Sequence, residues 1–202
     1  MTAARIFMKR AGPIALLCLA AAATASVAAG HVAGTPTASR CGGQLWRLKT
    51  LSDSQRRSVD LAAKATTIAA VGRRSYPRPV PRRRRTAFQR RTWEVVAQIT
   101  QYRSEGSGGV RLVLFDGGSY LNAVIPPPSC LSHATRARAD IATAWNLFAV
   151  KCTHPARDWQ SLGAIVYVRG VGFWSQRRQF RGAARNGAEL YPVTGLRFVA
   201  GC

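Results

Sequence analysis

The sequence predicts a mainly β protein with one central helix: a five-stranded OB-like Greek-key barrel that carries a short helical N-terminal arm. Two observations predict this fold. Three segments with alternating apolar and polar residues follow one another through Gly-rich turns, and a helical segment then separates them from two further strand-like segments. This order is typical of the OB type, and small SH3-like barrels and α+β sheets are the alternatives.

Apolar residues alternate along the first expected strand, where Trp93, Val95, Ala97 and Ile99 fall on one face. A period of two is the signature of a strand with one buried face. Glycines or prolines end the segments that show this pattern. The expected strands are residues 93–102, 110–116, 120–125, 162–168 and 195–201.

A helix is expected between the third and fourth strands, at residues 132–150. Ile141, Ala144 and Phe148 recur there at helical spacing, and Ser132 is the expected N-cap. The residues after the fourth strand, 169–189, are expected to form a long loop before the last strand.

The chain before the barrel divides into an arm and a linker. Residues 30–75 are expected to form the arm, with short helices capped by Ser52 and Thr67. The stretch YPRPVPRRRRTAFQRR, residues 76–91, has seven arginines and three prolines. Alternating prolines favour an extended path and consecutive arginines repel, so we predict an exposed linker that adds non-specific affinity for polyanions. The barrel domain is then expected at residues 92–202.

Residues 1–29 have the features of a cleaved secretory signal. A basic start precedes an apolar run of about 10 residues and several small residues, whereas a membrane-spanning helix needs roughly 20. An uncleaved anchor is the alternative. Export places the mature chain in the cell envelope or outside the cell, where four cysteines predict two disulfides. Of the three possible pairings, we favour Cys130–Cys152, around the helix, and Cys41–Cys202, between the ends.

The charge balance is strongly basic. The chain has 30 basic and 8 acidic residues, a formal net charge of +22. Such a chain is attracted to polyanions, which outside a cell include nucleic acids, anionic wall polymers and lipid headgroups. A GC-rich genome also produces arginine-rich sequences, so the composition by itself leaves both explanations open.

The predicted barrel offers one place for a polymer. Ligands of OB barrels cross the face of strands two and three, between the first turn and the loop joining strands four and five. Arginines there would neutralise phosphates, and aromatic rings would stack with bases or sugars. The alternative is that the rings close the end of the barrel and the arginines are only solvated. The predicted polymer-binding residues are Arg103, Arg111, Trp174, Arg177, Arg178, Phe180, Arg181 and Arg185.

Catalysis has less support in the sequence. No G-x-S-x-G, Walker or dinucleotide-binding pattern is present, and no cofactor or metal site is expected. Carboxylates that could perform acid–base or metal chemistry are Glu105, Asp116 and Glu189. They define the alternative of a degenerate or metal-dependent nuclease or hydrolase. A secreted structural or protein-interaction domain is the other alternative.

Five segments together resemble a family of exported, largely uncharacterised bacterial proteins: WEVVAQITQYRSE, RLVLFD, IPPPSC, GVGFW and NGAELYPVTGLRF. The family pattern includes G-V-G-F-F-D, a later His followed by Gly, and N-G-x-E-L-H-P-V. Here Trp174 and Ser175 replace the F-D pair, Arg178 and Gln179 stand near the His-Gly position, and Tyr191 replaces the second His. If the family uses a histidine for chemistry, this member has lost it.

These observations favour an exported, non-catalytic module that binds an anionic polymer, either a nucleic acid or a cell-wall glycan. The expected binding element is the basic, aromatic loop before the last strand.

Overall fold

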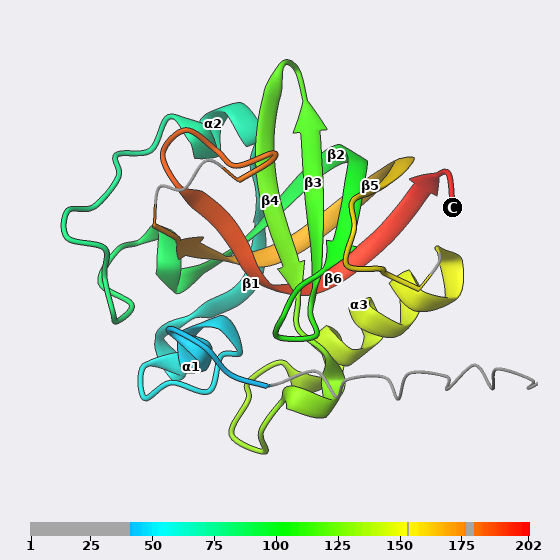
Figure 1. Cartoon of the computed structure of the whole chain (residues 1–202). Helices are drawn as coiled ribbons and strands as arrows, with labels where there is room; N and C mark the ends of the chain where they lie inside the picture. Colours follow the sequence, from blue (N-terminus) through cyan, green and yellow to red (C-terminus); the bar gives the residue numbers. More distant parts are fainter. Residues whose placement is uncertain (1–40, 153, 177–179) are drawn as a thin grey trace, which may run out of the picture. The chain divides into compact units, whose positions relative to one another are not determined.

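The computed structural model describes residues 41–152, 154–176 and 180–202, and the sheet dominates this part of the chain (Figure 1). The predicted signal, residues 1–29, lies outside the described residues. In these ranges no helix is long and apolar enough to cross a membrane. The helices are α1 (Trp46–Lys49), α2 (Ile68–Gly72) and α3 (Arg138–Lys151). The strands are β1 (Asp60–Ala65), β2 (Arg91–Ser104), β3 (Val110–Asp116), β4 (Ser119–Ile125), β5 (Gln160–Trp174) and β6 (Ala188–Ala200).

Five strands pair in a closed ring. β2 pairs antiparallel with β3 and β5, β3 pairs antiparallel with β4, β4 runs parallel to β6, and β6 closes the ring against β5. The helix α3 lies between β4 and β5 in the chain, as expected. The predicted mainly β class is therefore confirmed. The sheet has a sixth strand that the sequence did not predict, β1 from the arm, which pairs parallel with β2 outside the ring.

The core forms because the inward faces of the strands are apolar. On β2, Trp93, Val95, Ala97 and Ile99 are at most 6% exposed, as their alternation predicts. α3 packs against the core with Ala144 and Phe148, and Ile141 of the same helix is also buried. The core thus fills the ring and leaves the outer faces of β2 and β3 for loops and solvent.

The last two strands are longer than the sequence indicated. Residues 169–189 were expected to form a loop, but β5 continues to Trp174 and β6 begins at Ala188. Gly170 and Gly172 concealed this continuation, because glycine usually signals a turn. Gly172 serves close packing instead: a Cβ there would lie 2.2 Å from the carbonyl oxygen of Phe88.

The helix caps are only partly as predicted. Thr67 caps α2 by accepting a hydrogen bond from the amide of Ala70. Ser52 does not cap a helix, and the expected helix at Asp53 is replaced by a 3-10 turn, Arg56–Ser58. α3 begins at Arg138 rather than after Ser132, because Ala137 takes a left-handed conformation with φ of 58° and stops the helix there.

The Arg/Pro stretch is not a uniformly solvated tract. Arg82, Arg83 and Arg85 are exposed, but Arg84 is 2% exposed. Its guanidinium donates to Asp53 and to the carbonyl oxygens of Leu48 and Gln89 at 2.7–3.1 Å. The prediction of mutual repulsion fails at Arg84 because one carboxylate and two carbonyl groups compensate its charge. The stretch therefore anchors residues 41–75 of the arm, which belong to the same compact unit as the ring.

All four cysteines in the described part of the chain form disulfides, but the favoured pairing was wrong. The bonds are Cys41–Cys130 and Cys152–Cys202. α3 has 14 residues and is therefore about 21 Å long, so it separates the cysteines on either side of it. A disulfide needs Cα atoms within about 7 Å. The first bond ties the arm to the turn before α3, and the second ties the end of α3 to the end of β6.

Candidate anion-binding face and charged pocket

The loop between β5 and β6 lies on the outer face of β3. The amide of Ser175 donates to Gly187 O at 2.9 Å and closes the base of the loop. Gly182, with φ of 69°, contacts Val113 of β3 so closely that a Cβ would lie 2.3 Å from its Cγ1. Figure 1 shows this segment beside the β3–β4 hairpin. The loop thus brings Phe180 and Arg181 to the face where the sequence predicted a ligand.

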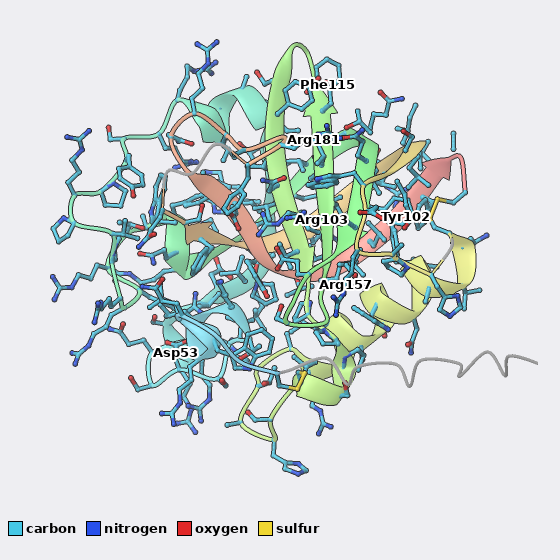
Figure 2. All side chains as sticks on the ribbon, viewed as in Figure 1. Asp53, Tyr102, Arg103, Phe115, Arg157 and Arg181 are labelled. Atoms are coloured by element: carbon cyan, nitrogen blue, oxygen red, sulfur yellow. A yellow bond between two sulfur atoms is a disulfide. The ribbon has the colours of Figure 1, made fainter. Side chains whose placement is uncertain are left out.

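Two arginines gather around an indole ring on this face. Arg103, from β2, places its Cζ 4.6 Å from the centre of the Trp159 ring, and Arg181 places its Cζ at 5.8 Å. Trp159 lies directly before β5. Arg103 and Arg157 line one hollow of about 520 Å³ beside the β2–β3 turn, together with Glu105 of that turn. Figure 2 shows Arg181, Arg103 and Arg157 following one another down the face of β2 and β3. We call Arg103, Arg157, Trp159 and Arg181 the basic stripe.

The arginines of the basic stripe have no ion-pair partner within the described ranges. All eight acidic side chains of the chain are described, and the five ion pairs all involve other arginines. Arg181 donates to Gln101 at 3.1 Å, whereas the buried Nε of Arg103 has no hydrogen-bond partner. These guanidinium groups therefore keep donors and charge for an external anion.

An aromatic pair continues the basic stripe toward the tip of the hairpin. The rings of Phe115 and Tyr120 have centres 4.8 Å apart, and Tyr120 is 46% exposed. Tyr120 and Arg181 line one hollow of about 430 Å³, with Gln101 and Val113 at its floor. One face thus combines exposed cations with an accessible ring.

Arg111 does not belong to this face, although the sequence placed it there. It is buried, with Nε 2.5 Å from Glu105 and Nη1 3.4 Å from Glu189. Burial alone would lower the pKa of Arg111, but the two carboxylates outweigh burial and raise it. Its charge is therefore satisfied internally, and it is not a polymer contact.

The three carboxylates proposed for catalysis do not assemble. Glu105 and Glu189 meet at Arg111, but Asp116 is exposed at the end of β3, opposite Ser119 in the hairpin turn. Among the described residues no group of three His, Cys, Asp or Glu could hold a metal ion. The pair that does meet is engaged with a guanidinium, which suits neither metal binding nor proton transfer.

A cavity of about 530 Å³ lies over this cluster. Lys49 of α1 lines it, and its Nζ is 5.6 Å from the ring centre of Phe173 and 5.3 Å from that of Tyr191. Burial lowers the pKa of Lys49, and Glu189 and Glu105 oppose that effect. Burial also raises the pKa of Tyr191. We call this cavity the charged pocket.

Other predicted polymer-binding residues lie elsewhere. Trp174 is 2% exposed, donates its Nε1–H to Thr86 at 3.0 Å and packs against Phe88, so it is a core residue rather than a stacking surface. Arg185 is exposed in a separate hollow beside α2. Arg177 and Arg178 lie outside the described residues. Of the described members of the predicted set, only Arg103 and Arg181 lie together around one ring, and Phe180 lines the charged pocket.

Sequence reasoning missed Arg157, Trp159 and Lys49. The first two stand immediately before a correctly predicted strand, and loop residues at strand ends are frequent ligand contacts. That signal was present in the sequence. Nothing in the sequence indicated Lys49, because its neighbours in the pocket come from distant strands.

No family model matches the chain, and no curated relative matches it. Two solved structures resemble it at the level of the chain path. An aspartyl-tRNA synthetase chain from Leishmania major Friedlin is 14% identical, with a TM-score of 0.43 over 70% of this chain and 21% of that chain. The asparaginyl-tRNA synthetase of Entamoeba histolytica, in complex with asparaginyl-adenylate, is 10% identical, with a TM-score of 0.39 over 71% of this chain and 25% of that chain. The chain thus spans a quarter or less of either protein, and at these scores the likeness carries no argument about function.

Proposed function

We propose that this protein is an exported, non-catalytic module that binds an anionic polymer along the basic stripe. The observation that carries the proposal is that Arg103, Arg157 and Arg181 lie along one face without a carboxylate partner. Unpaired arginines exchange hydration for phosphate, sulfate or carboxylate groups and release the counterions of the polymer. A linear array of them fits a chain of repeating charges better than a single small anion.

The ring of strands supports the proposal if it is a barrel of the OB type. β2, β3, β4, β5 and β6 then correspond to its five strands in order, and β3 and β4 form its usual ligand face. The basic stripe borders that face from the β2–β3 turn to the loop between β5 and β6. These are the two loops between which OB domains hold their ligands.

Single-stranded nucleic acid is the polymer that the face fits best. Arg103 stacks on Trp159, which orients its planar guanidinium for bidentate contact with a phosphate. Tyr120 offers an exposed ring for a base, and stacking of this kind does not depend on sequence. A wall glycan would contact the same arginines, but it has no bases to stack on Tyr120, so it would gain less binding free energy from that ring.

Export is part of the proposal. Residues 1–29 would act as a cleaved secretory signal, which would place the chain in the cell envelope or outside the cell. Two disulfides among the described residues suit an oxidising compartment. Membership of the exported family that the sequence resembles remains a proposal of the same kind.

Binding to a panel of polymers tests the function. Fluorescence anisotropy would compare a labelled single strand, longer than the roughly 4–16 nucleotides that one OB domain covers, with duplex DNA and a purified anionic wall glycan. We expect the single strand to bind most tightly and the affinity to fall steeply between about 50 and 200 mM salt. Tighter binding of the glycan would identify the glycan, rather than a nucleic acid, as the ligand. Absence of binding to every polyanion at low salt would refute the proposal.

The same samples test the catalytic alternative. Incubation of the single strand with the protein and Mg²⁺ or Ca²⁺ should leave the strand intact, because Arg111 holds both nearby carboxylates. Cleavage that Glu189→Gln abolishes would show that the protein is a nuclease instead.

A further inference from the structure

Two cations and two carboxylates balance one another in the inner part of the charged pocket, and Arg82, which is exposed, adds one positive charge to the lining. Arg111 and Lys49 supply the positive charges, and Glu105 and Glu189 supply the negative ones. The guanidinium of Arg111 forms an ion pair with one oxygen of each carboxylate. Lys49 Nζ has no carboxylate within 4.0 Å, although every acidic side chain of the chain lies in the described part. The cluster thus leaves one ammonium without a direct ionic partner.

Glu105 lines the same pocket and has one oxygen that Arg111 does not contact. Glu105 gives one oxygen to Arg111, and within the described ranges no group donates a hydrogen bond to its other oxygen. Its side chain is 18% exposed, whereas that of Glu189 is 3% exposed. A ligand can therefore reach Glu105 and Lys49, one group of each sign, while Glu189 and Arg111 hold the cluster together from below.

The rest of the pocket combines six apolar residues with Gln44, Arg82, Ser175 and Gln176. Rings of Phe173 and Tyr191 face the ammonium of Lys49, and Phe180 is 38% exposed above Arg111, 5.6 Å from its Cζ. A cavity of about 530 Å³ is within the range of small-molecule sites, which combine apolar walls with a few polar groups. The apolar lining consists of Leu45, Pro79, Val80, Phe173, Trp174 and Phe180.

We propose that the charged pocket binds a small zwitterion with an apolar side chain, of the free α-amino acid class. Its carboxylate contacts Lys49, its ammonium contacts the open oxygen of Glu105, and its side chain lies against Phe173 and Phe180. A plain anion would meet the field of two carboxylates, and a plain cation would meet Lys49, Arg111 and Arg82. A ligand that carries both signs matches the balanced inner cluster of Lys49, Arg111, Glu105 and Glu189 and satisfies both open groups, which a buried polar site requires.

Three small molecules of nearly equal size provide the test. Calorimetric titration of the full mature chain would use phenylalanine, hydrocinnamate, which lacks the ammonium, and phenethylamine, which lacks the carboxylate. We expect phenylalanine to bind at least about tenfold more tightly than either analogue, because each analogue loses one charge-assisted hydrogen bond. Equal binding of an analogue, or no phenylalanine binding at about 10 mM, would overturn the proposal.

Variants assign the contacts. Lys49→Met should lower the affinity for phenylalanine about tenfold or more, because the group that contacts the ligand's carboxylate is lost. The affinity for phenethylamine, which has no carboxylate, should not change. Lys64→Met, at an exposed position of β1, is the matched control and should have no effect. If Lys49→Met does not fold, the comparison of the three molecules on the unaltered chain still decides. Arg103→Ser should not affect phenylalanine, which separates this site from the polymer face.

Discussion

Arg84 Nη2 lies 2.9 Å from a carboxylate oxygen of Asp53, and the two side chains are only 1% and 11% exposed. This buried pair joins the Arg/Pro stretch to the arm. Arg84 also satisfies two backbone carbonyl groups, so its removal leaves three acceptors without their donor. Because of this pair, Arg84 is buried and has a structural role, whereas the other three arginines of the run are exposed.

Arg84→Met should therefore lower the free energy of unfolding by about 3–5 kcal/mol, the usual effect of stripping a buried charge of its partner. Arg83→Met, one residue earlier and exposed, should change it by less than about 0.5 kcal/mol. Urea unfolding of both variants measures the difference. Equal effects would mean that Arg84 is solvated in solution.

Arg111→Met should separate stability from polymer binding. Without Arg111, Glu105 and Glu189 face each other in a buried site, so we expect a loss of about 3–5 kcal/mol. The fraction that remains folded should bind the polymer as before, because Arg111 is not part of the basic stripe. A folded Arg111→Met chain with weakened polymer affinity would restore the original prediction that this arginine contacts the ligand.

The two disulfides should be recovered as Cys41–Cys130 and Cys152–Cys202 by peptide mapping without reduction. They close segments of 89 and 50 residues, so loss of either should cost about 4–5 kcal/mol by chain entropy. Unfolding of the two double Cys→Ser variants measures these losses. A peptide linking Cys130 to Cys152 would contradict the observed path of α3.

The pH dependence of the free energy of unfolding should reveal the lowered pKa of Lys49. Its pKa is lowered from the usual 10.5 by burial. Between the lowered value and 10.5 the unfolded chain binds more protons than the folded chain, so the contribution of Lys49 to stability increases as pH rises through this range. Urea unfolding at several pH values up to 10 should show a smaller increase for Lys49→Met than for the unaltered chain or for Lys64→Met. Identical pH profiles would mean that Lys49 is fully hydrated.

The strand pattern predicted most of the sheet because period-two alternation survives in single sequences. Trp93 to Ile99 and the helix around Ile141 appear where expected. The continuation of β5 was missed because Gly170 and Gly172 look like turn residues, although their role is to allow close packing. β1 was missed because five of its six residues are exposed and its apolar residues do not alternate.

The candidate sites were harder to predict because they depend on contacts between distant segments. Arg103 and Arg181, which were predicted from their place beside the expected ligand face, lie around the Trp159 ring, and their role in binding stays a prediction. Trp174 and Arg111 have the right residue types but are buried, and only three-dimensional packing distinguishes them from Trp159 and Arg157. Charge counts show that the chain is basic, but not which arginines already have carboxylate partners.

The salt dependence of single-strand binding tests the central claim most directly. The triple variant Arg103→Ser, Arg157→Ser and Arg181→Ser would be compared with Arg57→Ser, Arg73→Ser and Arg138→Ser, which removes the same charge at exposed positions elsewhere. If the basic stripe binds the phosphates, only the first variant should bind the strand weakly. The slope of its log affinity against log salt should then be less negative by about 2, which is about 0.7 for each lost phosphate contact. Equal slopes and affinities for the two variants would show that diffuse charge, rather than this face, attracts the polymer.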